Sequence, residues 1–145
     1  MADVQLGLTT KQSDSYYLGV SIGKGREGFY NVITGPGDAK TGTRWILREI
    51  AGTNAHLLVK SGGTADGLVV TFTDERQYLV MKPYDPANIQ QYIIVTPQKE
   101  PWVILNNHNE SNVMDRSMYP NDKGFVIGYP WNGGDNQIWK KHYYS

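Results

Sequence analysis

The sequence predicts an all-β fold of three equivalent lobes, and the first observation that predicts it is a pattern that recurs at a fixed spacing. Residues 32–45, 79–92 and 126–139 each carry a proline, a polar residue two positions later and a closing aromatic residue. Corresponding residues of successive windows are 47 positions apart. Because the chain holds only 7 prolines in 145 residues, this triple coincidence indicates an internal repeat. The prolines are Pro36, Pro83 and Pro130, the polar residues are Asp38, Asp85 and Asn132, and the aromatics are Trp45, Tyr92 and Trp139.

The second observation is that 16 glycines and 7 prolines separate short runs rich in Val, Ile, Thr and Tyr, which indicates strands and turns. Four such runs fall in each repeat, and twelve short strands in three sets of four define a β-trefoil. In that fold three hairpins cap one end of a six-stranded barrel. One repeat cannot bury its apolar face alone, so all three repeats must close around a common axis. We therefore predict a single domain over residues 1–145, with three pseudo-symmetric repeats at roughly 1–50, 51–97 and 98–145.

Each expected strand is a run of β-branched and aromatic residues that ends near a glycine, a proline or a polar turn. Residues 45–52 could also form a helix, but the segments at the same phase, 92–98 and 139–145, favour strands. The three closing aromatics are expected to fill the barrel core, since large rings dominate core burial. The expected strands are residues 4–9, 16–22, 29–34 and 44–50, then 56–60, 67–73, 77–82 and 91–96, and finally 102–106, 112–117, 125–129 and 137–144.

The composition excludes several classes of protein. The 14 basic and 14 acidic side chains cancel, which removes the positive surface typical of nucleic-acid-binding proteins. The chain has no cysteine, so disulfides, thiolate metal sites and cysteine nucleophiles are excluded. The first ten residues lack the basic and apolar parts of a signal peptide, and no apolar run is long enough to span a bilayer. We therefore expect a cytoplasmic or leaderless protein with no nucleic-acid partner and no membrane insertion.

No catalytic, metal or cofactor site is expected from the sequence. Residues 19–23 and 23–28 match short glycine motifs of hydrolases and nucleotide-binding loops, but a strand rather than a helix follows them. The three histidines lack the spacing of metal ligands. A glycoside hydrolase needs two carboxylates across a cleft, and only Asp115 is placed by a motif. The sequence therefore predicts a protein that is not an enzyme.

The third repeat carries polar groups that the core does not require. Asp115 lies on its second expected strand, Tyr129 follows fourteen residues later, and Asn136 and Gln137 stand just before Trp139. A carboxylate and an amide can bond neighbouring sugar hydroxyls, while an aromatic face covers the apolar C–H patch of a pyranose. These side chains therefore predict a carbohydrate-binding site in the third repeat.

The third repeat resembles the ricin-B-like or Q-x-W lectins. The resemblance rests on Asp115, on the aromatic Tyr129 and on the segment N-G-G-x-N-Q-x-W at residues 132–139. The threefold period and the absence of cysteine make the chain most similar to the fungal, mushroom-type members of that family. The repeat extends the resemblance over the whole chain, whereas the specific motif covers only residues 113–139.

The resemblance implies binding of terminal galactose or N-acetylgalactosamine on glycoproteins or glycolipids, with no cofactor. It assigns hydroxyl contacts to Asp115 and Asn136, stacking to Tyr129, and support of the loop to Gln137. Mushroom-type relatives are often homodimers, so a homodimer that agglutinates cells through several sites is a further implication.

Fungal relatives also use the segment after the third strand, which adds Gly128, Trp131 and Asn132 to the expected contact surface. Two structural alternatives stay open here. Trp131 could pack under the loop instead of stacking on the sugar. Asp115 could be a turn residue bonded to backbone N–H groups.

The polar residue shared by all three repeats, Asp38, Asp85 or Asn132, also has two interpretations. It could cap a turn, or it could anchor a sugar. If it is an anchor, the chain has three shallow sites, each of about millimolar affinity, which is about 4 kcal/mol. Such sites would be useful when several engage one surface.

The first and second repeats depart from the motif, so only weaker sites are expected there. The first has Gly19 or Ser21 where the third has its acid, and Thr43 where the third has glutamine. The second keeps Gln90 but has Ile89 in place of the asparagine. The expected weaker contacts are Gly35 and Asp38 in the first repeat, and Asp66, Lys82, Tyr84 and Asp85 in the second.

A second class of function is protease inhibition, because β-trefoils of similar length in fungi and plants block proteases through one exposed loop. Fold does not fix function. Residues 60–67 and 83–88 are candidate loops, although neither carries a decisive inhibitory signature. The motif of the third repeat is unnecessary for inhibition and therefore favours the lectin.

Overall fold

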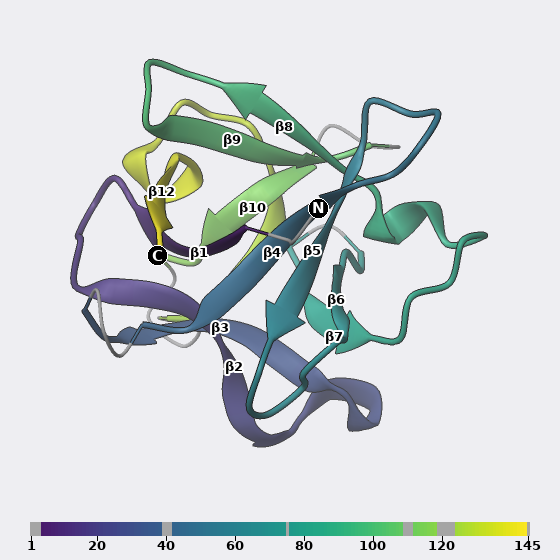
Figure 1. Cartoon of the computed structure of the whole chain (residues 1–145). Helices are drawn as coiled ribbons and strands as arrows, with labels where there is room; N and C mark the ends of the chain where they lie inside the picture. The colour runs from purple at the N-terminus through teal and green to yellow at the C-terminus, as the bar shows by residue number, and fades with distance from the viewer. Residues whose placement is uncertain (1–3, 39–41, 75, 109–111, 119–123, 145) are drawn as a thin grey trace.

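The fold is a β-trefoil, as the sequence predicts. The computed structural model describes residues 4–38, 42–74, 76–108, 112–118 and 124–144, and these contain twelve strands (Figure 1). The strands are β1 (Gln5–Thr10), β2 (Tyr16–Lys24), β3 (Tyr30–Pro36), β4 (Arg44–Glu49), β5 (His56–Ser61), β6 (Val69–Thr71), β7 (Val80–Lys82), β8 (Ile93–Pro97), β9 (Trp102–Asn107), β10 (Asn112–Arg116), β11 (Val126–Pro130) and β12 (Trp139–Tyr143). Short 3-10 helices η1 (Arg26–Gly28), η2 (Ile89–Gln91) and η4 (Asp135–Gln137) lie between strands.

Six of the strands close a barrel. Strand β1 pairs with β4 and β12, β5 pairs with β4 and β8, and β9 pairs with β8 and β12, all antiparallel. Each lobe gives its first and fourth strand to this ring. Every described barrel strand therefore has a neighbour on both sides, which removes the exposed edges of an open sheet.

Three hairpins, β2–β3, β6–β7 and β10–β11, cap one end of the barrel. They contact each other in a cycle, so each hairpin lies against the next lobe. The contacts pair Asn31 with Val80, Tyr78 with Ile127, and Phe125 with Ile33. The hairpin of the third lobe consequently sits between the second lobe and the first.

The barrel core confirms two of the three predicted closing aromatics. Trp45 and Trp139 are fully buried in one apolar cluster. The indole Nε1 of Trp45 donates to the Leu18 carbonyl, and that of Trp139 donates to the Met114 carbonyl, each at 2.9 Å. Each ring therefore fastens the last strand of its lobe to the second strand while filling the centre.

The prediction for Tyr92 is wrong, because Ile93 fills the core in the second lobe. Ile93 is 0% exposed and belongs to the same cluster as the two tryptophans, whereas Tyr92 is half-buried. The Tyr92 hydroxyl donates to the Pro86 carbonyl at 2.8 Å. The second lobe is thus offset by one residue from the spacing of the sequence pattern at this point.

All twelve predicted strands are present, with differences at their ends. Strands β8 and β12 begin at Ile93 and Trp139 rather than at Gln91 and Gln137, because η2 and η4 occupy the residues before them. The segment at residues 45–52 begins as strand β4 rather than as a helix. In the described ranges no helix has the length and apolar character needed to cross a membrane.

Candidate functional site

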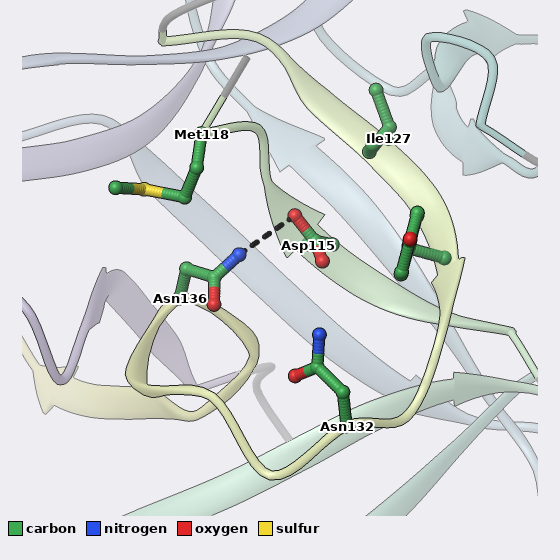
Figure 2. Close-up of a pocket in the computed structure, with 6 residues that line it drawn as sticks. Asp115, Met118, Ile127, Asn132 and Asn136 are labelled. Atoms are coloured by element: carbon green, nitrogen blue, oxygen red, sulfur yellow. Dashed lines mark hydrogen bonds between the residues drawn. The ribbon is translucent and has the colours of Figure 1, made fainter.

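A pocket of about 240 Å³ opens on the third lobe (Figure 2). It is lined by side chains from β10, from β11 and from the loop and 3-10 helix that follow. Asp115 is paired with Ile127 across the two strands, and Tyr129 lies two residues further along β11, so all three share one face of the hairpin. The lining residues are Asp115, Met118, Ile127, Tyr129, Asn132 and Asn136.

Asp115 forms the floor of this pocket and is only 4% exposed. Its Oδ1 accepts a hydrogen bond from Asn136 Nδ2 and its Oδ2 accepts one from Gln137 Nε2, both at 2.9 Å. Burial raises the pKa of Asp115 to about 6, although the two amide bonds act in the opposite direction. The interpretation of Asp115 as a turn residue is wrong, because it lies inside β10 and is bonded to side-chain amides.

Gln137 supports the pocket from below and does not line it. The side chain is fully buried, and its Nε2 donates to Asp115 Oδ2 and to the Pro130 carbonyl, each at 2.9 Å. Its Oε1 accepts from the Asn132 backbone N–H at 2.8 Å. One side chain therefore joins the carboxylate, the end of β11 and the start of the following loop. This geometry fits the supporting role that the resemblance implies.

The loop after β11 is a tight turn held by Asn132. Its Oδ1 accepts from the Gly134 backbone N–H at 2.8 Å, just as Asp85 Oδ1 in the second lobe accepts from the Ala87 N–H at 3.0 Å. The prediction that this shared position caps a turn is confirmed for Asn132 and Asp85. Asn132 also lines the pocket, so a turn cap and a ligand contact are compatible in the same side chain.

Gly134 is a residue that the sequence analysis did not single out. A Cβ atom there would lie 2.5 Å from Asn136 Oδ1 and 2.9 Å from Asn132 Oδ1. The neighbouring Gly133 is required for another reason, since its φ of 79° favours glycine. The first glycine thus forms the turn, and the second lets the two amides approach each other.

Two predicted contact residues lie outside the pocket. Gly128 is buried on β11, where a Cβ would come 3.1 Å from the Phe72 ring, so it serves close packing between lobes. Trp131 is 44% exposed and does not line the pocket. Neither residue lines the pocket, and their contact with a sugar stays a prediction.

Tyr129 lines the pocket with its ring held from outside. The guanidinium of Arg76 lies 5.1 Å from the ring centroid, and Arg76 Nη2 donates to the Tyr129 hydroxyl at 3.5 Å. This arginine comes from the second lobe. The aromatic wall of the pocket is therefore positioned by a neighbouring lobe, which the spacing of the motif could not indicate.

Met118 and Ile127 are lining residues that the sequence analysis missed. Ile127 could have been found, because it stands opposite Asp115 in the expected hairpin. Met118 had no signal in the sequence; its sulfur accepts from Gln12 Nε2 at 3.0 Å, so the first lobe steadies this wall. The pocket consequently depends on residues of all three lobes.

The second lobe lacks the carboxylate of this site. Thr71 pairs with Val80 in the register in which Asp115 pairs with Ile127, so a threonine stands in place of the acid. Asp66, the weaker contact expected near the second strand of this lobe, lies in the loop between β5 and β6, where its Oδ1 accepts from the Gly62 N–H at 2.6 Å, so it does not take the position of Asp115.

The supporting glutamine of the second lobe is Gln91 and not Gln90. Gln91 Oε1 accepts from the Asp85 N–H at 2.9 Å, and its Nε2 donates to the Pro83 carbonyl at 2.9 Å and to Thr71 Oγ1 at 3.2 Å. These bonds repeat those of Gln137. The one-residue offset seen in the core therefore extends into the loop, and Gln90 takes the position of Asn136.

The other weak-site candidates of the first two lobes do not assemble a pocket like that of the third. Lys82 stands in the position of Tyr129 and its Nζ lies 4.8 Å from the Phe29 ring centroid. Tyr84 is 43% exposed, and Gly35 offers no side chain. In the first lobe Gly19 occupies the position of the acid, with Thr43 beside it. Asp38 is exposed.

The chain shares its fold with solved β-trefoil structures. ThreeFoil, a designed 3-fold symmetric protein, has a TM-score of 0.75 at 19% identity, over 95% of this chain and 97% of that one. A structure described as the BEL β-trefoil has a TM-score of 0.68 at 11% identity, over 99% and 96%. A lectin of Polyporus squamosus bound to a human-type influenza-binding epitope has a TM-score of 0.72 at 10% identity, over 97% of this chain and 49% of the lectin.

These likenesses establish the fold alone, because the identities are low. Comparison of the sequence with protein-family models and with curated proteins gives no match.

Proposed function

We propose that this protein is a lectin without enzymatic activity that binds a terminal galactose or N-acetylgalactosamine in the pocket of the third lobe. The observation that supports this most directly is the convergence of Asp115, Tyr129, Asn132 and Asn136 on one pocket of about 240 Å³. Neutral saccharides are recognised by such a combination of oxygen acceptors, amides and one aromatic face.

The two halves of the pocket suit the two faces of a pyranose. The ionised Asp115 accepts hydrogen bonds from neighbouring hydroxyls, and bonds to a charged acceptor are the strong ones. The Tyr129 ring covers the C–H patch on the opposite side of the sugar. The preference for galactose-type sugars rests on the resemblance of the third repeat to Q-x-W lectins, whose motif supplies this set of residues.

We expect an affinity of about millimolar for one monosaccharide in this pocket. The acid, the ring and the amide at position 132 are combined in the third lobe alone among the described residues, so we propose one site per chain. Agglutination would then require association of chains, for example as a homodimer, because two sites per particle are needed to bridge cells.

We propose no catalytic activity for this pocket. Among the described residues that line the pocket, Asp115 is the only carboxylate, and hydrolysis of a glycoside needs a second one at a defined distance. Protease inhibition through residues 60–67 or 83–88 is the alternative function. Turn bonds to Asp66 and Asp85 order these loops, but no observation on the described residues favours inhibition over the pocket.

Calorimetric titration with lactose and with N-acetylgalactosamine tests the proposal. Wild-type protein should release heat with a stoichiometry of one. Asp115→Asn should lose most of the affinity, because it removes the charge and turns one of the oxygens that accept from the Asn136 and Gln137 amides into a donor. Asp66→Asn is the matched control and should bind like wild type, since Asp66 lies in a remote hairpin loop. Absence of binding to any galactoside by the wild type would overturn the proposal.

A further inference from the structure

We infer that Asn132 determines the specificity of the pocket as its amide donor, and that the ligand is a neutral saccharide edge that donates two neighbouring hydroxyls to Asp115 and Asn136 and accepts from Asn132. This inference rests on the proposed function. The orientations of the Asn132, Asn136 and Gln137 amides decide which donors and acceptors the pocket presents to a ligand.

The orientation of the Asn136 amide is fixed by its neighbours. Its Nδ2 donates to Asp115 Oδ1 at 2.9 Å and to the Arg116 carbonyl at 3.2 Å. Both neighbours are acceptors, so a flipped amide would place oxygen against oxygen at both contacts. Both N–H groups are thereby used inside the protein. Towards a ligand, Asn136 therefore offers only its Oδ1, an acceptor (Figure 2).

The Asn132 amide is fixed in the opposite sense. Its Oδ1 is engaged by the Gly134 backbone N–H at 2.8 Å, which leaves Nδ2 directed into the space between Asp115 and Asn136 (Figure 2). The remaining amide, Gln137, is fully buried, and its N–H groups donate to Asp115 Oδ2 and to the Pro130 carbonyl. Of the three amides, Asn132 is therefore the one that presents N–H groups to the pocket.

Asp115 completes the pattern as an acceptor. Each carboxylate oxygen already receives one amide hydrogen bond and retains capacity for another. The pocket thus offers acceptors at Asp115 and Asn136 and a donor at Asn132. A sugar hydroxyl can donate and accept, so two adjacent hydroxyls and one further oxygen satisfy this pattern. A carboxylate or sulfate on the same edge would face Asp115 and be repelled.

The second lobe supplies independent evidence that the amide at position 132 is not needed for the fold. Asp85 stands in the same place and forms the same turn bond, to the Ala87 N–H at 3.0 Å. The first lobe has Asp38 there. An acid at this position keeps the turn and removes the donor. The donor is thus confined to the lobe that also has the acid and the ring.

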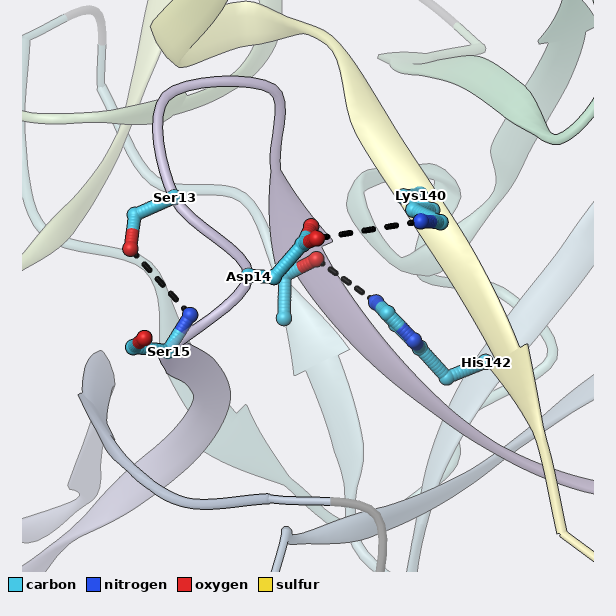
Figure 3. A network of polar contacts seen from close by, with 6 residues as sticks. Ser13, Asp14, Ser15, Lys140 and His142 are labelled. Atoms are coloured by element: carbon cyan, nitrogen blue, oxygen red, sulfur yellow. Dashed lines mark hydrogen bonds and ion pairs between the residues drawn. The ribbon is translucent and has the colours of Figure 1, made fainter.

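Two variants separate the donor role from its confounders. Asn132→Asp keeps the shape and the turn acceptor, as Asp85 shows, but adds a charge. Asn132→Ser is neutral and too short to reach the ligand. A serine can hold such a turn, because Ser13 Oγ accepts from the Ser15 N–H at 3.1 Å in this chain (Figure 3). The reciprocal control, Asp85→Asn, adds an amide to the second lobe, where Thr71 and Lys82 stand at the positions of Asp115 and Tyr129.

The variants are titrated with lactose and with N-acetylgalactosamine by calorimetry, and their unfolding is followed by heating. We expect both Asn132 variants to lose at least about tenfold in affinity while the melting temperature stays within about 2 °C of wild type. Asp85→Asn should bind like wild type at an unchanged stoichiometry.

The outcomes distinguish this inference from the proposed function. If wild type binds, Asp115→Asn does not, and both Asn132 variants retain affinity, the donor role is wrong while the lectin stands. If only Asn132→Asp loses affinity, charge repulsion and not the missing donor is the cause, and the inference is again overturned. If wild type binds neither sugar, the proposed function itself fails.

Discussion

Gln137 donates a hydrogen bond of 2.9 Å to the carboxylate of Asp115, and both side chains are almost completely shielded from solvent. The contact joins the second strand of the third lobe to the segment just before its last strand, 22 residues later. The same glutamine also engages the carbonyl of Pro130 and the N–H of Asn132. A single buried amide thus keeps the floor and the rim of the candidate pocket in fixed relation.

Replacement of Gln137 by alanine should therefore destabilise the protein and abolish binding together. The substitution removes the partner of Asp115 Oδ2, of the Pro130 carbonyl and of the Asn132 backbone N–H, at a cost of about 1–3 kcal/mol for each buried group that stays dry, while Asn136 still donates to Asp115 Oδ1. We expect a net loss of about 3 kcal/mol in the free energy of unfolding, measured with urea. Gln98→Ala, at an exposed position, is the control and should change stability by less than about 0.5 kcal/mol.

Substitution of Gly134 should damage the pocket more than the fold. The backbone of Gly134 has φ −72° and ψ 151°, which alanine adopts without strain, but the added Cβ would collide with the amide oxygens of Asn132 and Asn136. We expect Gly134→Ala to weaken galactoside binding at least about tenfold with a stability change below about 1 kcal/mol. Gly35→Ala, at a position where no heavy atom lies within 4 Å of an added Cβ, should bind normally. Equal affinities of the two variants would contradict the crowded geometry.

A lower pH should weaken ligand binding and raise the contribution of Asp115 to the free energy of unfolding. The pKa of Asp115 is raised by burial to about 6, so one pH unit below that value only about one tenth of the carboxylates are ionised. If the ligand needs the ionised acceptor, affinity should fall about tenfold between pH 7 and pH 5, measured by calorimetry. An affinity unchanged across the range would contradict either the raised pKa or the contact between this carboxylate and the ligand.

The contribution of Asp115 to the free energy of unfolding depends on pH in the opposite direction to its contribution to binding. Because the pKa in the folded state lies above the unfolded value of 3.8, the stabilising contribution is present below pH 3.8 and is lost as the pH rises through about 6. In urea titrations at pH 5 and pH 7, Asp115→Asn should therefore gain stability relative to wild type as the pH rises. A relative loss of stability would contradict the cause assigned to the pKa shift.

The one-residue offset of the second lobe predicts which of two neighbours holds the core. Ile93→Ala removes a fully buried side chain and should cost about 2–5 kcal/mol, whereas Tyr92→Phe removes one half-exposed hydroxyl contact and should cost about 1 kcal/mol or less. Thermal and urea unfolding measure both. A larger loss of stability for Tyr92→Phe would contradict the offset, because Tyr92 would then be the core residue that the spacing of 47 residues predicts.

Much of the fold could be predicted from local information. Strand order and number follow from the β-branched runs between glycines and prolines, and the repeat fixes how often the unit occurs. The spacing was misleading from η2 to Ile93, because a fixed sequence interval does not detect the extra residue in the loop between β7 and η2. The choice between Tyr92 and Ile93 depended on which side chain the closed barrel could accommodate.

The candidate site shows the same division. The sequence by itself determined that an acid, a ring and two amides occur in one repeat, since these are properties of residue type and interval. Only the tertiary structure decided the direction of each amide, the need for space at Gly134, the wall supplied by Met118 and the failure of Asp66 to take part. Hydrogen-bond direction and steric room depend on atoms brought together from distant parts of the chain, and packing alone sets those distances.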